Sequence, residues 1–228
     1  MPNIPNHVVL FPDGNRRFAK AKGWASFDGH MQGEKKFDEF LHWAKDAGVK
    51  IITVFGFSSE NWKRSKEEVD YLMKLFEKYL GEGIEDFNKE GVLVKIIGQK
   101  ERLPESLQEV IKKVEDATKN NKNFHLNLAV SYGGKWDIVD AVKKILEKNI
   151  SPENITEELI NEHLSTAGLP DPDLIIRPGG EMRLSNFVLW QGAYAELYFS
   201  PKMWPDFTKE DFDLALAEFD RRTRRFGK

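Results

Sequence analysis

The sequence contains no cysteine, which excludes disulfide bonds and thiolate metal sites. It also lacks any apolar run approaching the ~20 residues that a membrane-spanning helix requires. The first residues, 1–6, show neither the basic nor the apolar region of a secretory signal peptide. We therefore expect a cytoplasmic protein that has no membrane span.

An excess of charge of one sign is missing as well. The chain carries 34 basic and 37 acidic side chains, which are interspersed, for a formal net charge of -3. This balance gives no electrostatic reason to expect a nucleic-acid partner. The nucleotide-binding patterns G-x-x-x-x-G-K-[ST] and G-x-G-x-x-G after a strand are absent, as are the G-x-S-x-G nucleophile turn and the zinc motif H-E-x-x-H.

What the 228 residues do contain is an alternation of apolar strands and amphipathic helices. Such an alternation predicts an α/β fold with a largely parallel sheet. No linker or repeat interrupts it, so we expect residues 1–228 to form a single domain. The predicted strands cover residues 7–11, 51–57, 92–97, 124–130, 174–176 and 195–199, and the longer predicted helices 31–47, 66–90, 136–148 and 209–222.

The first strand ends in a turn that carries several chemically active groups. Pro12, Asp13, Gly14 and Asn15 form a strong turn signal, and two arginines follow them. In parallel α/β sheets, ligands bind at the carboxyl ends of strands. Asp13 could hold a divalent metal, Gly14 lets the backbone approach a ligand, and the arginines could pair with phosphate oxygens. The alternative is an ordinary strand-turn-helix junction.

Polar groups also follow or lie on other predicted strands. They are Ser58, Asn61 and Arg64 after the second strand, Arg177, Arg183 and Ser185 after the fifth, and Glu196 on the sixth. Two acids among many arginines suggest a metal-bridged diphosphate, because forked guanidinium groups match phosphate geometry. Each arginine alone could equally be a solvated surface residue. The apolar stripe of the helix between Val69 and Phe87 could be core, or could line a tunnel for a lipid chain.

These motifs, taken in order, resemble the cis-prenyltransferases of the undecaprenyl diphosphate synthase family. The resemblance runs from His7 to Gly227. It includes D-G-N-R-R at residues 13–17, G-H at 29–30, F-S-S-E-N-W at 57–62, Y-G-G-K-W-D at 132–137, I-R-P-G-G-E-M-R-L-S-N-F at 176–187, A-Y-A-E-L-Y-F at 193–199 and W-P-D-F at 204–207.

The resemblance implies a homodimer whose six-stranded, mostly parallel sheet encloses a hydrophobic tunnel. It implies Mg²⁺-dependent condensation of isopentenyl diphosphate with an allylic diphosphate, farnesyl or geranyl diphosphate, to give a (Z)-polyprenyl diphosphate. A lipid product makes transient membrane contact an expectation too.

By the same resemblance, Asp13 and Glu196 hold the metal, with Glu196 acting across the dimer, and Asn15 and Ser58 assist proton removal. The residues implied to bind substrate are Gly14, Asn15, Arg16, Arg17, Phe18, His30, Ser58, Asn61, Trp62, Arg64, Arg177, Arg183 and Ser185. The ending Arg225-Phe226-Gly227 matches the family's R-x-G pattern, which reaches the isopentenyl site of the partner.

Four positions depart from the family's usual residues. Ser26 stands where an arginine is common, Met182 where His or Gln is usual, Pro12 in place of Met, and Pro178 in place of Thr or Ser. A branch of the family that performs irregular, lavandulyl-type coupling shares a proline before the aspartate in some members, so irregular coupling is one alternative. A non-catalytic subunit of a heteromeric prenyltransferase is another, although the Asp13 turn is intact. A kinase or phosphatase is the third, but no nucleotide loop or nucleophile is visible.

Product length depends on two bulky residues. Phe124 begins a strand where the family's tunnel floor lies, and Tyr79 lies on the long helix. If both point inward, they shorten the tunnel, and we expect a short-to-medium chain below C55. If they point into the core, nothing follows about length.

Overall fold

The computed structural model describes residues 3–222, and its centre is a six-stranded sheet. The strand order is β3-β4-β2-β1-β5-β6, and every neighbouring pair is parallel. The strands are β1 (His7–Leu10), β2 (Ile51–Ser58), β3 (Val92–Ile97), β4 (Phe124–Tyr132), β5 (Leu174–Arg177) and β6 (Glu196–Phe199). The expected α/β fold with a six-stranded parallel sheet is confirmed.

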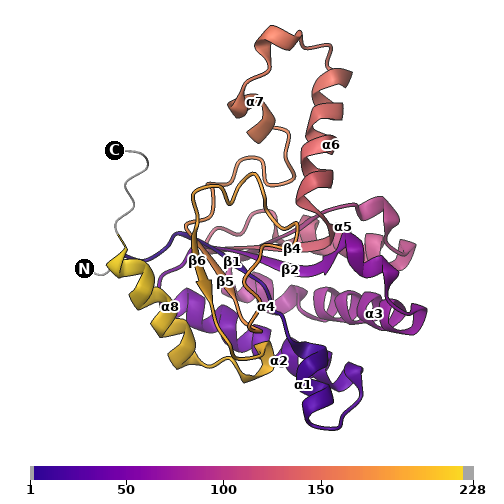
Figure 1. Ribbon diagram of the computed structural model, residues 1–228. Coiled ribbons are helices and arrows are strands. Elements are labelled where there is room, and N and C mark those ends of the chain that lie inside the picture. Colours follow the sequence, from indigo (N-terminus) through magenta and orange to yellow (C-terminus); the bar gives the residue numbers. More distant parts are fainter. Residues whose placement is uncertain (1–2, 223–228) are drawn as a thin grey trace.

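Helices connect most of the strands (Figure 1). They are α1 (Asn15–Ala21), α2 (Ser26–Asp46), α3 (Lys66–Glu82), α4 (Ile84–Glu90), α5 (Glu105–Thr118), α6 (Gly134–Glu147), α7 (Glu157–Asn161) and α8 (Lys209–Arg221), with short 3₁₀ turns η1 (Ser59–Lys63), η2 (Lys100–Arg102), η3 (Pro152–Asn154) and η4 (Trp204–Asp206). Helices α2, α3, α4, α5 and α8 cover one face of the sheet. Figure 1 shows α6 and α7 projecting away from the side of the sheet on which α2, α3 and α8 lie.

The predicted long helix over residues 66–90 is in fact two helices, α3 and α4, which meet at Gly83. The Gly83 N–H donates to the Tyr79 carbonyl and ends α3. A side chain at Gly83 would lie 2.8 Å from the Phe87 ring, so only glycine permits this close junction. Gly91, with φ of 68°, then ends α4 in the left-handed conformation that glycine adopts without strain.

Two apolar layers hold the sheet. The larger buries residues of α2, α3, α4, α5 and α8 against one face, together with alternate strand residues such as Leu10, Val54 and Leu128. The opposite face packs Val9, Phe11 and their strand neighbours against the segment that contains Phe187. Because β1, β2, β4 and β5 are largely buried on both sides, they read as nearly continuous apolar runs, whereas all four residues of β6 are only partly buried.

The strand order reverses at β1, since the chain continues from it to β2 on one side and reaches β5 on the other. Ligands of open parallel sheets bind outside the carboxyl ends of strands at such a switch point. The Asp13 turn follows β1, and the ends of β2 and β5 flank it at Ser58 and Arg177. The topology therefore explains why three separated motifs meet.

Among residues 3–222, no helix is both long and apolar enough to cross a membrane. The ending Arg225-Phe226-Gly227, which the resemblance assigns to the partner's site, lies outside the described residues.

Candidate active site

The turn after β1 is fixed by backbone hydrogen bonds to two other segments of the chain. The Phe11 N–H donates to the Ile176 carbonyl (2.9 Å), and the Trp204 N–H donates to the Asp13 carbonyl (2.9 Å). Gly14 has φ of 105°, and a Cβ there would lie 3.0 Å from Met203 Cβ. The position requires glycine for both its conformation and its space. The main chain thus presents the Asp13 carboxylate at the edge of the sheet.

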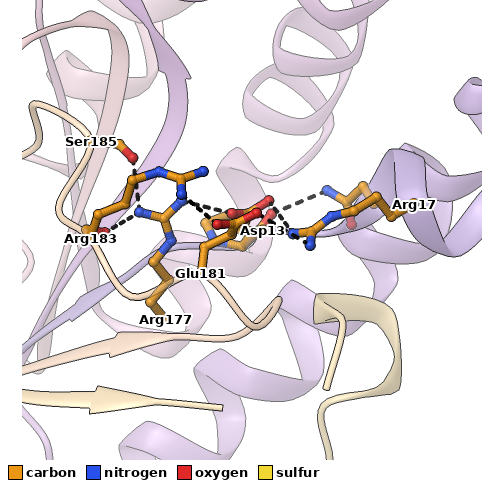
Figure 2. A network of polar contacts seen from close by, with 8 residues as sticks. Asp13, Arg17, Arg177, Glu181, Arg183 and Ser185 are labelled. Atoms are coloured by element: carbon orange, nitrogen blue, oxygen red, sulfur yellow. Dashed lines mark hydrogen bonds and ion pairs between the residues drawn. The ribbon is translucent and has the colours of Figure 1, made fainter. Parts of the chain in front are cut away.

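Arg177 is the buried partner of that carboxylate (Figure 2). Its Nη2 donates to Asp13 Oδ2 (2.8 Å), and Arg17 Nη2 contacts the other oxygen, Oδ1 (3.3 Å). Arg177 is only 4% exposed. Its guanidinium stacks over the Phe11 ring at 4.9 Å and donates to Ser185 Oγ (2.9 Å). These contacts fix the orientation of the Arg177 guanidinium before any ligand binds.

The loop after β5 adds a second carboxylate, Glu181, which the sequence analysis did not select. Its two oxygens contact Arg17 Nη1 (3.6 Å) and Arg183 Nη1 (2.5 Å), as Figure 2 shows. Gly179 and Gly180, with φ of 103° and 75°, let the loop fold back toward Arg17. The backbone oxygen of Arg183 also accepts from Arg177. Asp13 and Glu181 therefore alternate with three arginines.

A second cluster is centred on another carboxylate that was missed, Glu68 of α3. Glu68 Oε1 accepts from Arg64 Nη1 (3.0 Å) and lies 3.3 Å from His30 Nε2, while Oε2 lies 3.7 Å from Arg16 Nη1. Burial lowers the pKa of His30 below its usual value, although the hydrogen bond to Glu68 offsets part of this effect. His30 is therefore neutral at pH 7. The i,i+4 spacing of Arg64 and Glu68 was the sequence signal for this pair.

Two adjoining pockets of about 550 and 750 Å³ open between these clusters. Pro12, Asp13, Asn15, His30 and Arg64 line both of them. The predicted residues that line one pocket or both are Asp13, Gly14, Asn15, Arg16, Arg17, His30, Ser58, Asn61, Arg64, Arg177 and Ser185. Most of the residues implied by the resemblance thus surround one continuous opening.

The second pocket also contains groups that bear on the missing arginine at Ser26. Ser26 itself lines this pocket, and so does Lys20, which the sequence analysis did not select. Lys20 lies one helical turn after Arg16 on α1, so the two cations share a helix face. The pocket therefore gains a positive charge from α1 where α2 offers only a hydroxyl.

Three of the predicted substrate-binding residues do not line these pockets. The Phe18 ring is buried beside Trp24. The Trp62 indole donates to Ser131 Oγ (2.9 Å) and packs on the Phe57 ring. The Arg183 side chain is largely exposed at the rim of the Glu181 cluster.

Glu196 lies at the end of the sheet where the parallel strands begin, and Asp13 lies at the end where they finish. This position corrects the grouping of Glu196 with the residues at the carboxyl ends of the strands. Glu196 begins β6 beside Leu174, whereas Asp13 follows the far ends of the strands. Its carboxylate accepts from Arg222 Nη1 (2.7 Å). Parallel pairing fixes this position, since Phe199, not Glu196, is the β6 residue opposite Arg177. Glu196 therefore cannot join Asp13 within one chain.

Ser58 and Asn61 hold each other through reciprocal hydrogen bonds at the start of η1. Ser58 Oγ accepts from the Asn61 N–H (3.2 Å), and Asn61 Oδ1 accepts from the Ser58 N–H (3.1 Å). Asn15 differs, because its buried Oδ1 has no hydrogen-bond partner among the described residues. Gly33 of α2 leaves the space for it, since a Cβ there would lie 2.4 Å from Asn15 Oδ1. Asn15 thus keeps a free acceptor beside the pockets.

An apolar cavity of about 100 Å³ continues inward from the pockets. Pro12, Asn15 and His30 stand at its entrance, and its deeper walls include Val54, Leu72, Leu75, Phe76, Leu128 and Tyr79. Tyr79 and Glu34 also line an outer pocket of about 370 Å³, in which Phe124 lies. Phe124 lines only the outer pocket and not the inner cavity, and Tyr79 and Glu34 are the residues common to both.

A divalent metal would find only part of its coordination shell in this chain. Residues 3–222 contain no group of three or more His, Cys, Asp or Glu side chains arranged to hold one. Asp13 lines both pockets, and its side chain is about one-third exposed. Magnesium is often bound by one or two carboxylates together with substrate phosphates and water. The single carboxylate therefore fits a metal that arrives with, or is completed by, a phosphorylated ligand.

Comparison with known proteins places these features in a family. The family model described as "Putative undecaprenyl diphosphate synthase" matches residues 11–227. A protein of Methanocaldococcus jannaschii named tritrans,polycis-undecaprenyl-diphosphate synthase (geranylgeranyl-diphosphate specific) is 48% identical, over 99% of this chain and 84% of its own length. An isoprenyl transferase of Thermotoga maritima is 47% identical, over 98% and 97% of the two chains.

A solved structure is similar over nearly the whole chain. It is the lavandulyl diphosphate synthase of Lavandula x intermedia in complex with dimethylallyl diphosphate, which superposes with a TM-score of 0.94 at 39% identity. The two chains are each covered to 99%. The arrangement of strands and helices is therefore shared with a protein that was crystallised in complex with an allylic diphosphate.

Proposed function

The chain belongs to the undecaprenyl diphosphate synthase family of cis-prenyltransferases, and we propose that it condenses isopentenyl diphosphate with an allylic diphosphate to give a (Z)-polyprenyl diphosphate. One observation carries the proposal. Two separate arginine clusters, around Asp13 and around Glu68, flank an opening that leads into an apolar cavity. Two diphosphates and one hydrocarbon chain need this combination of sites.

The cluster around Asp13 suits isopentenyl diphosphate. Arg177 is buried and aimed by Ser185, and Arg183 stands beside them on the same loop. The cluster around Glu68 suits the allylic diphosphate, because His30 and Asn15 also stand at the entrance of the apolar cavity. An allylic substrate bound there would place its diphosphate among cations and its hydrocarbon tail in the cavity.

The reaction would join the allylic C1 carbon to the terminal carbon of isopentenyl diphosphate. The allylic C–O bond breaks and its electron pair leaves with the diphosphate, while the isopentenyl C3=C4 π electrons form the new carbon–carbon bond. A proton then leaves C2, its bonding pair becomes the new C2=C3 double bond, and the released diphosphate takes up the proton. Arg16 and Arg64 stabilise the negative charge that develops on the leaving diphosphate. The unpaired Oδ1 of Asn15 and the Oγ of Ser58 are the acceptors that we assign to help remove the proton.

We assign Mg²⁺ as the cofactor and Asp13 as its ligand in this chain. The remaining ligands would be diphosphate oxygens and water. When bound, the metal supplies charge that neutralises the diphosphates. Before the metal and the diphosphates bind, Arg17 and Arg177 keep the Asp13 carboxylate oriented toward the opening.

The size of the apolar cavity bears on chain length. A cavity of about 150 Å³ accommodates benzene, which corresponds to about 25 Å³ per carbon atom. The cavity of about 100 Å³ therefore holds about four carbon atoms, less than one five-carbon unit, so a primer tail would fill it and extend into the adjoining pockets. We propose geranyl or farnesyl diphosphate as the primer and a product shorter than C55, although the M. jannaschii relative is named for an undecaprenyl product.

We also propose that the chain acts as a homodimer. In one chain Glu196 lies where the strands begin and Asp13 lies where they end, so Glu196 can serve a metal site only in a second copy. We further propose that the enzyme is cytoplasmic and contacts the membrane transiently when it releases its lipid product.

The direct test is prenyl transfer by the purified protein. Radiolabelled isopentenyl diphosphate, geranyl or farnesyl diphosphate and Mg²⁺ should yield label that enters an organic phase, and Asp13→Ala should abolish it. Chromatography of the dephosphorylated product then gives its length. Absence of extractable label from the wild-type protein would favour a non-catalytic subunit.

A second candidate is irregular coupling of the lavandulyl type. Pro12 favours it, as does the similarity to lavandulyl diphosphate synthase. Dimethylallyl diphosphate as the only substrate separates the two functions, because regular elongation requires isopentenyl diphosphate. A branched product in that assay would replace the first proposal with the second.

A further inference from the structure

Three side chains of the proposed allylic-diphosphate site share one carboxylate. Arg64, His30 and Arg16 lie 3.0, 3.3 and 3.7 Å from the oxygens of Glu68. All three line the 750 Å³ pocket, whereas Glu68 does not. Glu68 therefore contacts them from behind, on the side away from the pocket.

The local fold holds Glu68 firmly in this position. Ser65 caps α3, and its Oγ accepts the Glu68 N–H (3.3 Å). Glu68 is only 7% exposed, and a buried carboxylate requires cationic or hydrogen-bonding partners. Its partners come from separate segments, namely α1, α2 and the residues that precede α3. One carboxylate thus ties together three parts of the chain at the pocket wall.

We propose that Glu68 is a positioning residue for the allylic diphosphate, which holds Arg16, Arg64 and His30 toward the pocket before substrate binds. The inference rests on the function proposed above, because it needs the allylic diphosphate in this pocket. An arginine has five N–H donors in a rigid fork, so contact with Glu68 on one side leaves donors for phosphate oxygens. Two arginines against one carboxylate also leave the cluster with net positive charge.

The Arg16 contact is poorly suited to a role in stability alone. The Arg16 side chain is 56% exposed and lies 3.7 Å from Glu68, and exposed ion pairs contribute little to folding. What the contact does fix is direction, since a long arginine side chain loses its orientation without a partner. Orientation of binding groups affects the substrate that they contact. The hydrogen bonds that position Arg177, to Ser185 and Asp13, involve none of the three partners of Glu68, although His30 and Arg64 line both pockets.

Three variants test the proposal. Glu68→Gln keeps the shape and removes the charge, Glu68→Asp keeps the charge on a shorter side chain, and Glu67→Gln is the matched control. Glu67 lies in the same helical turn and is exposed, and its replacement by Gln removes the same charge near the start of α3. The readouts are the KM values for the two substrates and the binding of geranyl thiodiphosphate, an unreactive allylic analogue, by calorimetry without isopentenyl diphosphate.

We expect Glu68→Gln to raise the KM for the allylic substrate and the Kd of the analogue by about tenfold, the lower end of the effect of one charge-assisted hydrogen bond. The KM for isopentenyl diphosphate should rise much less, because His30 and Arg64 line the Arg177 pocket but the bonds that hold Arg177 are untouched. Glu68→Asp should recover part of the loss, and Glu67→Gln should match the wild type. Unchanged allylic binding in Glu68→Gln, or an equal loss for both substrates, would overturn the proposal.

The analogue also separates this inference from the proposed function. If the wild-type protein binds geranyl thiodiphosphate and Glu68→Gln weakens it, Glu68 positions the site even where no prenyl transfer is detected. If wild-type protein transfers prenyl groups and Glu68→Gln binds the analogue normally, the function stands and the role of Glu68 is refuted. If the wild-type protein does not bind the analogue, both proposals fail.

Discussion

Removal of the Tyr79 ring should lengthen the product. Tyr79 lines both the inner cavity of about 100 Å³ and the outer pocket of about 370 Å³, together with Glu34, and we take its ring as the barrier between them. Its ring packs between Phe37 and Phe87, with centroids 6.0 Å from each. Its hydroxyl hydrogen-bonds with Asp38. Burial, followed by the Asp38 charge, raises the pKa of Tyr79 well above its usual value, so the hydroxyl stays neutral.

The two volumes set the expected size of the effect. At about 25 Å³ per carbon atom, the outer pocket of 370 Å³ has room for up to about three additional five-carbon units. Tyr79→Ala should therefore shift the main product upward by two or three such units. The enzyme should keep measurable turnover, because the diphosphate clusters are untouched.

Aromatic-to-alanine substitutions in cores cost about 3–5 kcal/mol of unfolding free energy, so Tyr79→Leu serves as a milder second variant. Tyr79→Phe is the matched control, since it removes the bond to Asp38 and keeps the bulk. The assay is reversed-phase chromatography of dephosphorylated products formed from geranyl diphosphate. A product of unchanged length from both Tyr79→Ala and Tyr79→Leu, at wild-type folding, would refute the cavity argument.

Three further perturbations follow from the geometry. Asp13→Ala and Glu196→Gln, each inactive alone, should regain about a quarter of wild-type prenyl transfer when the purified chains are exchanged, because half of the randomly mixed dimers contain one intact site. Gly33→Ala places a Cβ 2.4 Å from Asn15 Oδ1 and should lower kcat by up to about a hundredfold without loss of thermal stability. Burial and Lys95 lower the pKa of His125 to about 4, so the folded state should lose stability between pH 6.5 and 4, as measured by urea unfolding.

Each of these has its control. Failure of the exchanged chains to regain activity would place Glu196 outside the partner's site. Gly81→Ala, where the nearest atom would be 3.7 Å away, should leave kcat unchanged. The sign at His125 follows because the unfolded state binds a proton below pH 6.5 and the folded state does not until about pH 4. His125→Gln should flatten that part of the pH profile, and an equally steep profile would contradict the assignment.

The sequence predicted elements that are buried on both faces or punctuated by glycine. Each strand read as an apolar run, and the Asp13 turn was marked by its own residues. The relation between elements was harder to predict. Glu196 reads as a strand residue, but only the pairing of Leu174 with Glu196 shows that it lies at the strand's beginning. Glu68 looks like an ordinary acidic residue in a first helical turn, and its partners are 38 and 52 positions away at His30 and Arg16.

The position of Phe124 relative to Tyr79 also could not be predicted from the sequence. It leads to a prediction about which of the two substitutions must come first. The sequence suggested Phe124 as a tunnel floor, yet it lies in the outer pocket beyond Tyr79. A chain stopped at Tyr79 never reaches Phe124, so Phe124→Ala alone should leave the product length unchanged. In a Tyr79→Ala background the chain would enter the outer pocket, and Phe124→Ala should then lengthen the product further. If Phe124→Ala has an effect only when Tyr79→Ala is also present, the effects of the two substitutions on product length are non-additive. If Phe124→Ala alone lengthened the product, the chain would have to pass Tyr79 in the native enzyme, and Tyr79 would not be the barrier.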